Sequence, residues 1–216
     1  MNRSFPTEDA TSRRGLRITA PKRSRNNVGH LVTPTPSITS VPELVVVTGP
    51  IASGKSAVTK ALADRLGKAG RSAAVVDLDD IVAMLHAPPE NVEQTWETAR
   101  EVHGRLVGEW LSSGVDAVIV DGPFYSPSET AALMQCVPTG IAARRVMLLA
   151  TYDLALERVA RDPSRGVSKD PVILRLLYEE FARQLPSIDP CEWNFDTSEC
   201  SVDDVVTTVA SALLAN

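Results

Sequence analysis

The stretch from Gly49 to Ser56, Gly-Pro-Ile-Ala-Ser-Gly-Lys-Ser, constrains the fold of this chain more than any other. It follows the apolar run 44–47, a predicted strand, and precedes residues 57–66, whose apolar side chains recur at helical spacing. Glycine residues let such a turn fold tightly enough to aim several backbone N–H groups at one phosphate, and the following helix adds its positive end. This order of elements predicts a phosphate-binding loop, or P-loop.

The residues of this loop have distinct expected parts in nucleotide binding. Lys55 supplies a mobile positive charge for the outer phosphates, and the hydroxyl of Ser56 suits a Mg²⁺ ion. The other positions expected to surround the phosphates are Gly49, Ile51, Ala52, Ser53, Gly54 and Ala57. The alternative interpretation is a glycine-rich turn with a purely structural role.

The rest of the chain from Glu43 alternates between apolar runs and stretches of helical periodicity. Apolar runs without polar alternation are typical of parallel strands buried on both faces. Strands are expected near 43–48, 72–76, 117–120, 145–150 and 193–195, and helices near 54–68, 81–85, 91–113, 126 onward, 153–161, 171–185 and 202–214. The pattern predicts an α/β fold in which helices cover both faces of a parallel sheet.

Polar residues follow the predicted strands at the points where each strand ends. The P-loop, Asp77 with Asp79, Asp121, the segment after Ala150 and the turn 196–198 all stand in this position. Because loops at the carboxyl ends of parallel strands converge on one crevice, we expect all of them along one edge of the sheet.

Three of these carboxylates have expected chemical roles. Asp121 closes an apolar strand, where a carboxylate reaches a metal directly or through a water. Asp77 and Asp79 share a face if the segment is extended, so that Asp79 can take a proton from a substrate hydroxyl while Asp77 helps to hold Mg²⁺. Asp80 is then expected to cap the next helix, whereas the alternative makes all three aspartates of this segment solvent-exposed and capping carboxylates.

A polar segment at about 162–170 is expected to form a mobile lid. Arg158 and Arg161 lie on the helix before it, and Arg165 lies within it. Guanidinium groups that close over a reaction neutralise the charge on a transferring phosphoryl group and exclude water. The alternative is a solvated face with surface ion pairs.

Composition bounds the remaining possibilities. We expect one domain at 43–216 and a disordered tail at 1–42, which is rich in Ser, Thr, Pro and Arg; a targeting segment or a misassigned start are the alternatives for this tail. The tail carries seven basic and two acidic residues, and the remainder carries 15 basic and 25 acidic ones. An acidic body argues against nucleic-acid binding, and no apolar run approaches the roughly 20 residues of a membrane span.

The cysteines Cys136, Cys191 and Cys200 are widely spaced and form no CxxC pair. They indicate neither a zinc site nor a disulfide framework, so a reducing cytoplasmic location is expected. We expect no nucleic-acid or membrane partner, and either a monomer or a homodimer.

Taken together, these motifs resemble the small P-loop kinases, a group that includes shikimate kinase, gluconate kinase, adenylylsulfate kinase, chloramphenicol phosphotransferase and the zeta-toxin-like kinases. The resemblance spans about 43–214 and rests on the P-loop, Asp-Leu-Asp at 77–79, Val-Asp-Gly-Pro at 120–123, the arginines of the lid region and Asp-Thr-Ser at 196–198. It implies a P-loop NTPase three-layer sandwich with a five-stranded parallel sheet and a short lid, with ATP as donor and Mg²⁺ as cofactor.

The resemblance also implies roles by position. Asp79 matches the carboxylate that binds and deprotonates the acceptor hydroxyl, and Asp77 matches the one near Mg²⁺. Arg161 matches a lid-base arginine that contacts adenine or phosphates, Arg165 one that faces the transferred group, and Thr197 lies in the loop beside the adenine ring.

The expected function is the ATP-dependent phosphorylation of a hydroxyl group on a small molecule whose identity stays open. The chain lacks the Gly-Gly-Gly substrate turn of shikimate kinase, because its third strand ends Asp121-Gly122-Pro123. One alternative is a nucleoside monophosphate kinase, for which only Arg100 and Arg105 offer a grip on a second phosphate. Another is a non-catalytic ATP-binding switch or ATPase module, in which Asp79 would be dispensable.

Overall fold

Five parallel strands form one sheet in the computed structural model, which describes residues 41–163 and 167–215. The strands are β1 (Glu43–Thr48), β2 (Ala73–Asp77), β3 (Ala117–Asp121), β4 (Ala143–Leu149) and β5 (Trp193–Asp196). Their order is β2-β3-β1-β4-β5, and all four pairings are parallel. The strand before the P-loop therefore lies at the centre of the sheet, as its apolar sequence requires.

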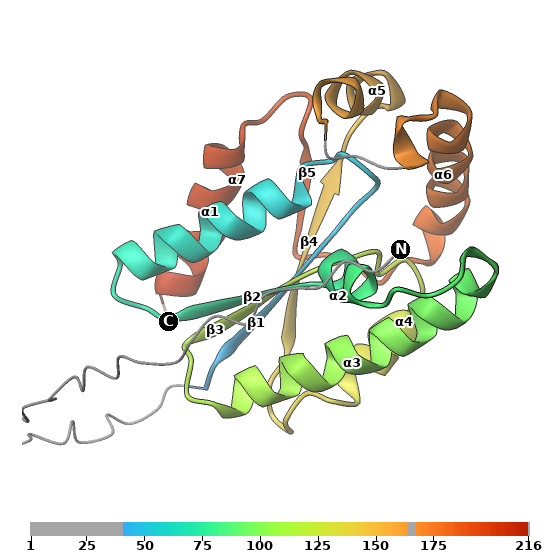
Figure 1. Ribbon diagram of the computed structural model, residues 1–216. Helices are drawn as coiled ribbons and strands as arrows, with labels where there is room; N and C mark the ends of the chain where they lie inside the picture. The colour runs from blue at the N-terminus through green and yellow to red at the C-terminus, as the bar shows by residue number, and fades with distance from the viewer. Residues whose placement is uncertain (1–40, 164–166, 216) are drawn as a thin grey trace, which may run out of the picture. The chain divides into compact units, whose positions relative to one another are not determined.

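Helices cover both faces of this sheet (Figure 1). They are α1 (Lys55–Lys68), α2 (Leu78–Met84), α3 (Val92–Ser112), α4 (Pro127–Met134), α5 (Tyr152–Arg161), α6 (Pro171–Gln184) and α7 (Val202–Leu214), with 3-10 turns at Pro89–Asn91, Val167–Lys169 and Leu185–Ser187. Alternate residues of β1 enter opposite layers: Val45 and Val47 pack with α1 and α7, whereas Leu44 and Val46 pack with α3 and α4. The predicted three-layer α/β sandwich is confirmed.

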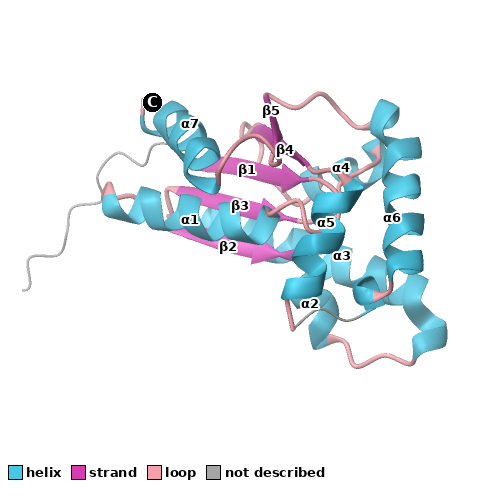
Figure 2. Cartoon of the chain, turned by 90° about the horizontal axis from the view of Figure 1, so that it is seen from above, coloured by secondary structure: helices cyan, strands magenta, loops and turns pink. Residues whose placement is uncertain are grey.

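The carboxyl ends of the strands point toward α2, α5 and α6, which lie beyond this edge of the sheet (Figure 2). The P-loop and the segments after β2, β3, β4 and β5 all leave the sheet there. The convergence predicted from the strand order is therefore confirmed, and the candidate site lies at this edge.

The junction between β2 and α2 differs from the sequence prediction. α2 begins at Leu78, because the Asp77 side chain already accepts a hydrogen bond from the Asp79 N–H at 2.9 Å. The prediction that Asp80 caps this helix was wrong, and Asp79 lies in the first helical turn rather than on an extended segment. At α4, Ser126 is the N-cap and forms a reciprocal capping box with Glu129.

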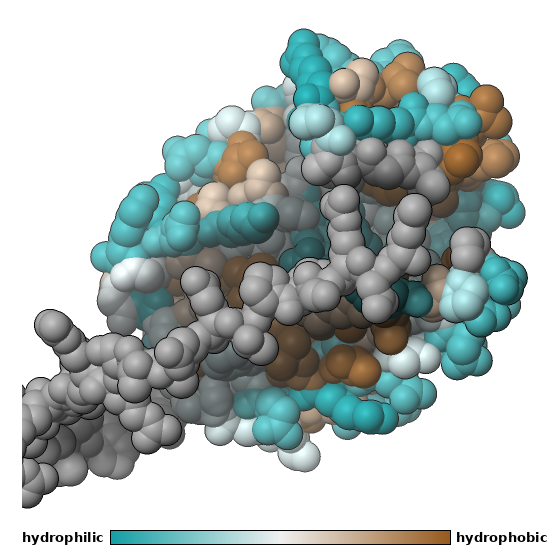
Figure 3. All heavy atoms as spheres, in the orientation of Figure 1, coloured by the Kyte–Doolittle hydropathy of each residue, from teal (hydrophilic) through white to brown (hydrophobic). Residues whose placement is uncertain are grey.

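α6 is attached to the body by few buried side chains. Leu174 and Phe181 are its buried residues, whereas Val172 and Leu176 expose 68% and 59% of their surface, and brown spheres gather over this helix in Figure 3. The predicted lid is described only in part, because Ser164, Arg165 and Gly166 lie outside the described residues, as does the predicted tail up to residue 40. No helix in the described ranges is both long enough and apolar enough to span a membrane.

Candidate active site

The backbone of the P-loop has positive φ angles at three positions, two of which are occupied by glycine. Gly49 has φ 145°, and a Cβ atom there would lie 2.0 Å from the main-chain oxygen of Leu148 on β4. Gly54 has φ 98° and Ala52 has φ 58°, both in the left-handed region. The loop therefore folds tightly against the neighbouring strand, and Gly49 is irreplaceable for a steric as well as a conformational reason.

The start of α1 is arranged to receive an anion. Its N-cap, Gly54, has no side chain to satisfy the first N–H groups of the helix. The hydroxyl of Ser53 is fully buried in the same loop and has no hydrogen-bond partner in the protein. Buried polar atoms and open helix N–H groups fit a phosphate ligand, so the residues present suit the nucleotide that the sequence predicts.

The Lys55 ammonium group lies along the loop. Its Nζ atom donates to the carbonyl oxygen of Gly49 at 3.0 Å and to that of Pro50 at 3.3 Å. Its positive charge also acts on Asp121, whose pKa it lowers against the effect of burial. The ammonium group thus contacts the P-loop and also acts on the carboxylate at the end of β3.

Ser56 links the P-loop to two carboxylates. Its hydroxyl donates to Asp121 Oδ2 at 2.9 Å and lies 3.3 Å from Asp77 Oδ2. The two carboxylates stand side by side because Asp77 pairs with Asp121 in the β2–β3 register. A hydroxyl and carboxylates are the oxygen ligands that Mg²⁺ prefers, so the three residues predicted to serve the metal are brought together and fit it.

The candidate metal position combines an incomplete set of protein ligands with a buried carboxylate. Among the described residues no three His, Cys, Asp or Glu side chains form a metal-binding group by themselves, so a bound Mg²⁺ would complete its shell with phosphate or water oxygens. Burial raises the pKa of Asp121 to about 6, and the negative charges of Asp77 and Asp79 act in the same direction. A divalent cation would offset this cost of a buried carboxylate.

Asp79 faces the same region from α2. It is exposed, and its charge raises the pKa of both Asp121 and Tyr125. The predicted base therefore lies near enough to the candidate metal-binding carboxylates for its charge to act on one of them.

Among the described residues, Arg158 is the arginine that bonds the P-loop. It donates to the main-chain oxygen of Ala52 at 2.8 Å, and to the side chain and main chain of Thr197 at 3.0 and 2.9 Å. Thr197 in turn donates to Leu149 O at 3.0 Å. One guanidinium group thus connects the phosphate-binding loop with the turn after β5.

Arg161 and Arg165 are the two arginines with predicted roles in the reaction. Arg161 is exposed and pairs with Glu157 on its own helix, and Arg165 lies outside the described residues. The sequence held a signal that Arg158 faces the protein rather than the solvent. It lies three residues after Ala155 and one before Val159, the buried positions of α5. The roles of Arg161 and Arg165 stay predictions.

A cavity of about 490 Å³ opens between the start of α1 and the turn after β5. This volume is in the range of small-molecule sites, and its mixed lining suits a planar ring with polar edges. Thr197 and Ala57, both predicted to contact the nucleotide, belong to the lining. The remaining lining residues are Ser53, Gly54, Val58, Arg158, Cys200, Ser201, Val202 and Val205.

Two tyrosines to which the sequence analysis gave no role also bond the backbone of the P-loop. The Tyr125 hydroxyl donates to Gly49 O at 2.7 Å, and the Tyr178 hydroxyl donates to Ile51 O at 2.9 Å. Burial raises the pKa of Tyr178 to about 12 and raises that of Tyr125 as well, so both hydroxyls stay protonated donors at neutral pH. Tyr125 also packs edge-on against Phe181 of α6, with 5.2 Å between ring centroids.

Comparison with known proteins identifies the family of the chain. Residues 44–177 match the family described as an AAA domain, and because the match covers more than half of the chain, the protein belongs to that family. No curated protein matches the sequence.

Several solved structures share the fold. Shikimate kinase from Bacteroides thetaiotaomicron has a TM-score of 0.59 at 16% identity, over 79% of this chain and 98% of that one. A gluconokinase from Sinorhizobium meliloti has 0.51 at 20% identity, over 81% and 93%, and the tunicamycin resistance protein from Deinococcus radiodurans has 0.54 at 15% identity, over 80% and 95%. The fold is that of the small P-loop kinases, with the subfamily unresolved.

Proposed function

We propose that this protein is an ATP-dependent kinase that transfers the γ-phosphoryl group to a hydroxyl of a small molecule. The observation that carries the proposal is the Ser56 hydroxyl held between Asp121 and Asp77 at the end of the P-loop, with Asp79 facing the same region. Phosphoryl transfer needs little covalent chemistry from the protein, so a site that positions charge around two substrates is sufficient.

On the donor side, the residues bind and orient the nucleotide. The P-loop amides and the start of α1 surround the phosphates, and Lys55 offsets the negative charge that spreads over the transferring group. The adenine ring of the nucleotide fits the cavity between α1 and the turn after β5, where Arg158 fixes Thr197. Mg²⁺, held by Ser56 with Asp77 and Asp121, would supply further neutralisation of the phosphate oxygens.

On the acceptor side, Asp79 takes the proton of the attacking hydroxyl. It is a suitable base because it is exposed at the start of a helix, next to the phosphate-binding loop rather than buried under it. Asp121 is not suited to this part, because its carboxylate is buried and hydrogen-bonded to Ser56.

The arginines on which a nucleoside monophosphate kinase would depend are engaged elsewhere. Arg100 bonds Glu129 at 2.7 Å, and Arg105 pairs with Glu101 on the surface of α3. Each guanidinium group already has a carboxylate beside it, which favours a hydroxyl acceptor over a second nucleotide.

The proposal is tested by Mg²⁺-dependent ADP release in the presence of a panel of alcohols, nucleosides and nucleoside monophosphates. We expect acceptor-stimulated turnover that Lys55→Ala and Asp79→Asn each reduce by about a thousandfold, since one removes charge stabilisation and the other the base. Asp80→Asn, one residue further along α2, is the matched control and should leave the rate within about twofold. Stimulated turnover that survives both site variants unchanged would refute the kinase assignment.

A further inference from the structure

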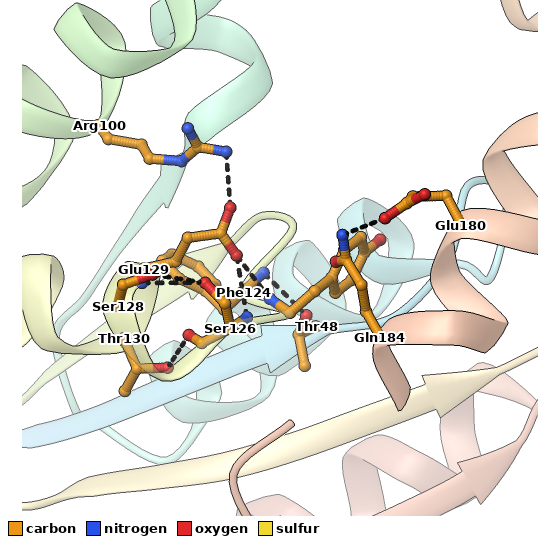
Figure 4. A network of polar contacts seen from close by, with 10 residues as sticks. Thr48, Arg100, Phe124, Ser126, Ser128, Glu129, Thr130, Glu180 and Gln184 are labelled. Carbon is orange, nitrogen blue, oxygen red and sulfur yellow. Dashed lines mark hydrogen bonds and ion pairs between the residues drawn. The ribbon is translucent and has the colours of Figure 1, made fainter. Parts of the chain in front are cut away.

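Arg100 and Glu129 form a partly buried ion pair beside the acceptor side of the site. Arg100 Nη2 donates to Glu129 Oε1 at 2.7 Å, and their side chains are 29% and 21% exposed. The guanidinium group also lies over the ring of Trp96, 5.7 Å from its centroid. The pair joins α3 to α4 across 29 residues of sequence, and Figure 4 shows Arg100 reaching down to the Glu129 carboxylate.

Glu129 is held in place by its second oxygen. Oε2 accepts hydrogen bonds from the Tyr125 N–H at 2.8 Å and from the Ser126 N–H at 3.1 Å. Tyr125 in turn bonds Gly49 of the P-loop, and the charges of Asp79 and Glu129 both act on its hydroxyl. The Glu129 carboxylate is therefore fixed beside Tyr125, whose hydroxyl lies at the P-loop and feels the charge of Asp79.

The other basic side chains on the elements around this place are engaged as well. This holds for the described residues of α2, α3, the segment 122–134 and 167–185. Arg105 pairs with Glu101 and Arg183 with Glu180, while Arg175 stacks on Tyr152 at 4.1 Å and Lys169 donates to Pro163 O. The carboxylates of Asp77, Asp79 and Asp121 face the same space.

We infer that the acceptor is an alcohol without a carboxylate or phosphate group, and that Glu129 sets this preference by occupying Arg100. The inference rests on the proposed kinase function. An acidic acceptor would have to share the charge of Arg100 with Glu129 and would stand among carboxylates, so that its binding is disfavoured. An uncharged alcohol meets no such barrier and keeps Asp79 as its hydrogen-bond acceptor.

The test uses acceptors in matched pairs that differ by one acidic group: methyl glycosides against the corresponding methyl glucuronides, and nucleosides against their 5′-monophosphates. In each pair that is phosphorylated, we expect the kcat/KM of the uncharged member to exceed that of the acid by at least about tenfold. An acid that is used as well as its uncharged partner, or better, overturns the inference while leaving the kinase proposal intact. If Mg²⁺·ATP binds and no pair is turned over, the kinase proposal fails and this inference with it.

Glu129→Gln tests the assigned residue. Glutamine can keep the capping box at the start of α4, so the substitution removes the charge that holds Arg100 and preserves the local fold. We expect the preference for uncharged acceptors to fall about tenfold, chiefly through a lower KM for the acidic members.

Glu101→Gln is the matched control, because it releases Arg105 from an exposed pair one turn further along α3, and it should not change the preference. If Glu129→Gln leaves the ratio as in the parent protein, Glu129 is not the specificity determinant. If that variant does not fold, Arg100→Met provides the second test and should leave acidic acceptors at least as strongly rejected; a gain in their use would overturn the assignment.

Discussion

The two halves of the site are held by different kinds of contact. The donor half consists of residues 49–56, Arg158 and Thr197, and its contacts run mainly through the peptide backbone: Gly49, Pro50 and Ala52 carbonyls accept the bonds that hold Lys55 and Arg158. The acceptor half consists of Asp79, Tyr125 and the Arg100–Glu129 pair. Its distinguishing contact joins two side chains from separate helices, Arg100 of α3 and Glu129 of α4.

This difference has a physical consequence for specificity. Contacts to the backbone depend little on the identity of the residue that supplies the carbonyl oxygen, so they are altered only when the loop itself changes shape. Side-chain contacts change with single substitutions that leave the backbone in place. The acceptor half can therefore diverge among proteins of one fold while the donor half stays recognisable.

The largest expected effect comes from Gly49→Ala in the donor half. The added Cβ would stand 2.0 Å from Leu148 O at a backbone φ of 145°, so the loop or β4 must move. We expect a loss of about 4 kcal/mol of unfolding free energy, combining backbone strain with overpacking, together with the loss of ATP binding. Urea denaturation and ATP titration measure the two effects.

Gly54→Ala is the control for this prediction. A Cβ there would meet nothing within 4 Å, so only the left-handed conformation at φ 98° opposes the change. We expect a loss of about 1–2 kcal/mol. Equal losses at the two positions would show that the close approach of Gly49 to β4 is not what fixes the loop.

Asp121→Asn separates the effect of this carboxylate on folding stability from its effect on activity. Asparagine keeps an oxygen to accept the Ser56 hydrogen bond but carries no charge for the metal. We expect turnover to fall about 100-fold, as is typical when a metal site loses a supporting group. In metal-free buffer at pH 8, the same substitution should make the protein more stable by up to about 3 kcal/mol, because no charge remains to be buried.

The pH dependence gives the sign of this effect. The folded-state pKa of Asp121 is about 6, above the ordinary value of 3.8, so the stability due to its protonated form is fully present below about pH 3.8. It is lost as the pH rises through 6. Urea denaturation should therefore show the parent and Asp121→Asn converging near pH 4 and separating by pH 8. A constant difference across this range would contradict the buried-charge explanation.

The fold was largely predictable because its signals are local. The apolar runs at β1, β3 and β4 have no polar alternation, and only burial on both faces explains them. The start of α2 was misplaced because Asp77 serves twice: one oxygen caps the helix and the other lies beside Ser56. Sequence spacing around 77–80 does not reveal such shared use.

The P-loop could be located from the sequence, since its glycines, Lys55 and Ser56 lie within eight consecutive residues. Arg158 was not selected, although the buried positions Ala155 and Val159 flank it, because its partners Ala52 and Thr197 lie 106 and 39 residues away. The Arg100–Glu129 pair belongs to the same class. Contacts between side chains on distant elements depend on how helices pack, which a single sequence specifies only through the completed fold.

The smallest expected effect distinguishes two arginines of α5. Lysine at position 158 can reach one acceptor but cannot bridge Ala52 O and both oxygens of Thr197, because it lacks the planar guanidinium fork. We expect Arg158→Lys to raise the KM for ATP about tenfold, or about 1.4 kcal/mol, with little change in the KM for the acceptor. Arg161→Lys should change neither constant, since Arg161 is exposed and pairs with Glu157. If steady-state kinetics instead shows the larger effect at Arg161, that residue contacts the nucleotide during turnover, as the family resemblance implies, and Arg158 serves only to hold the donor half together.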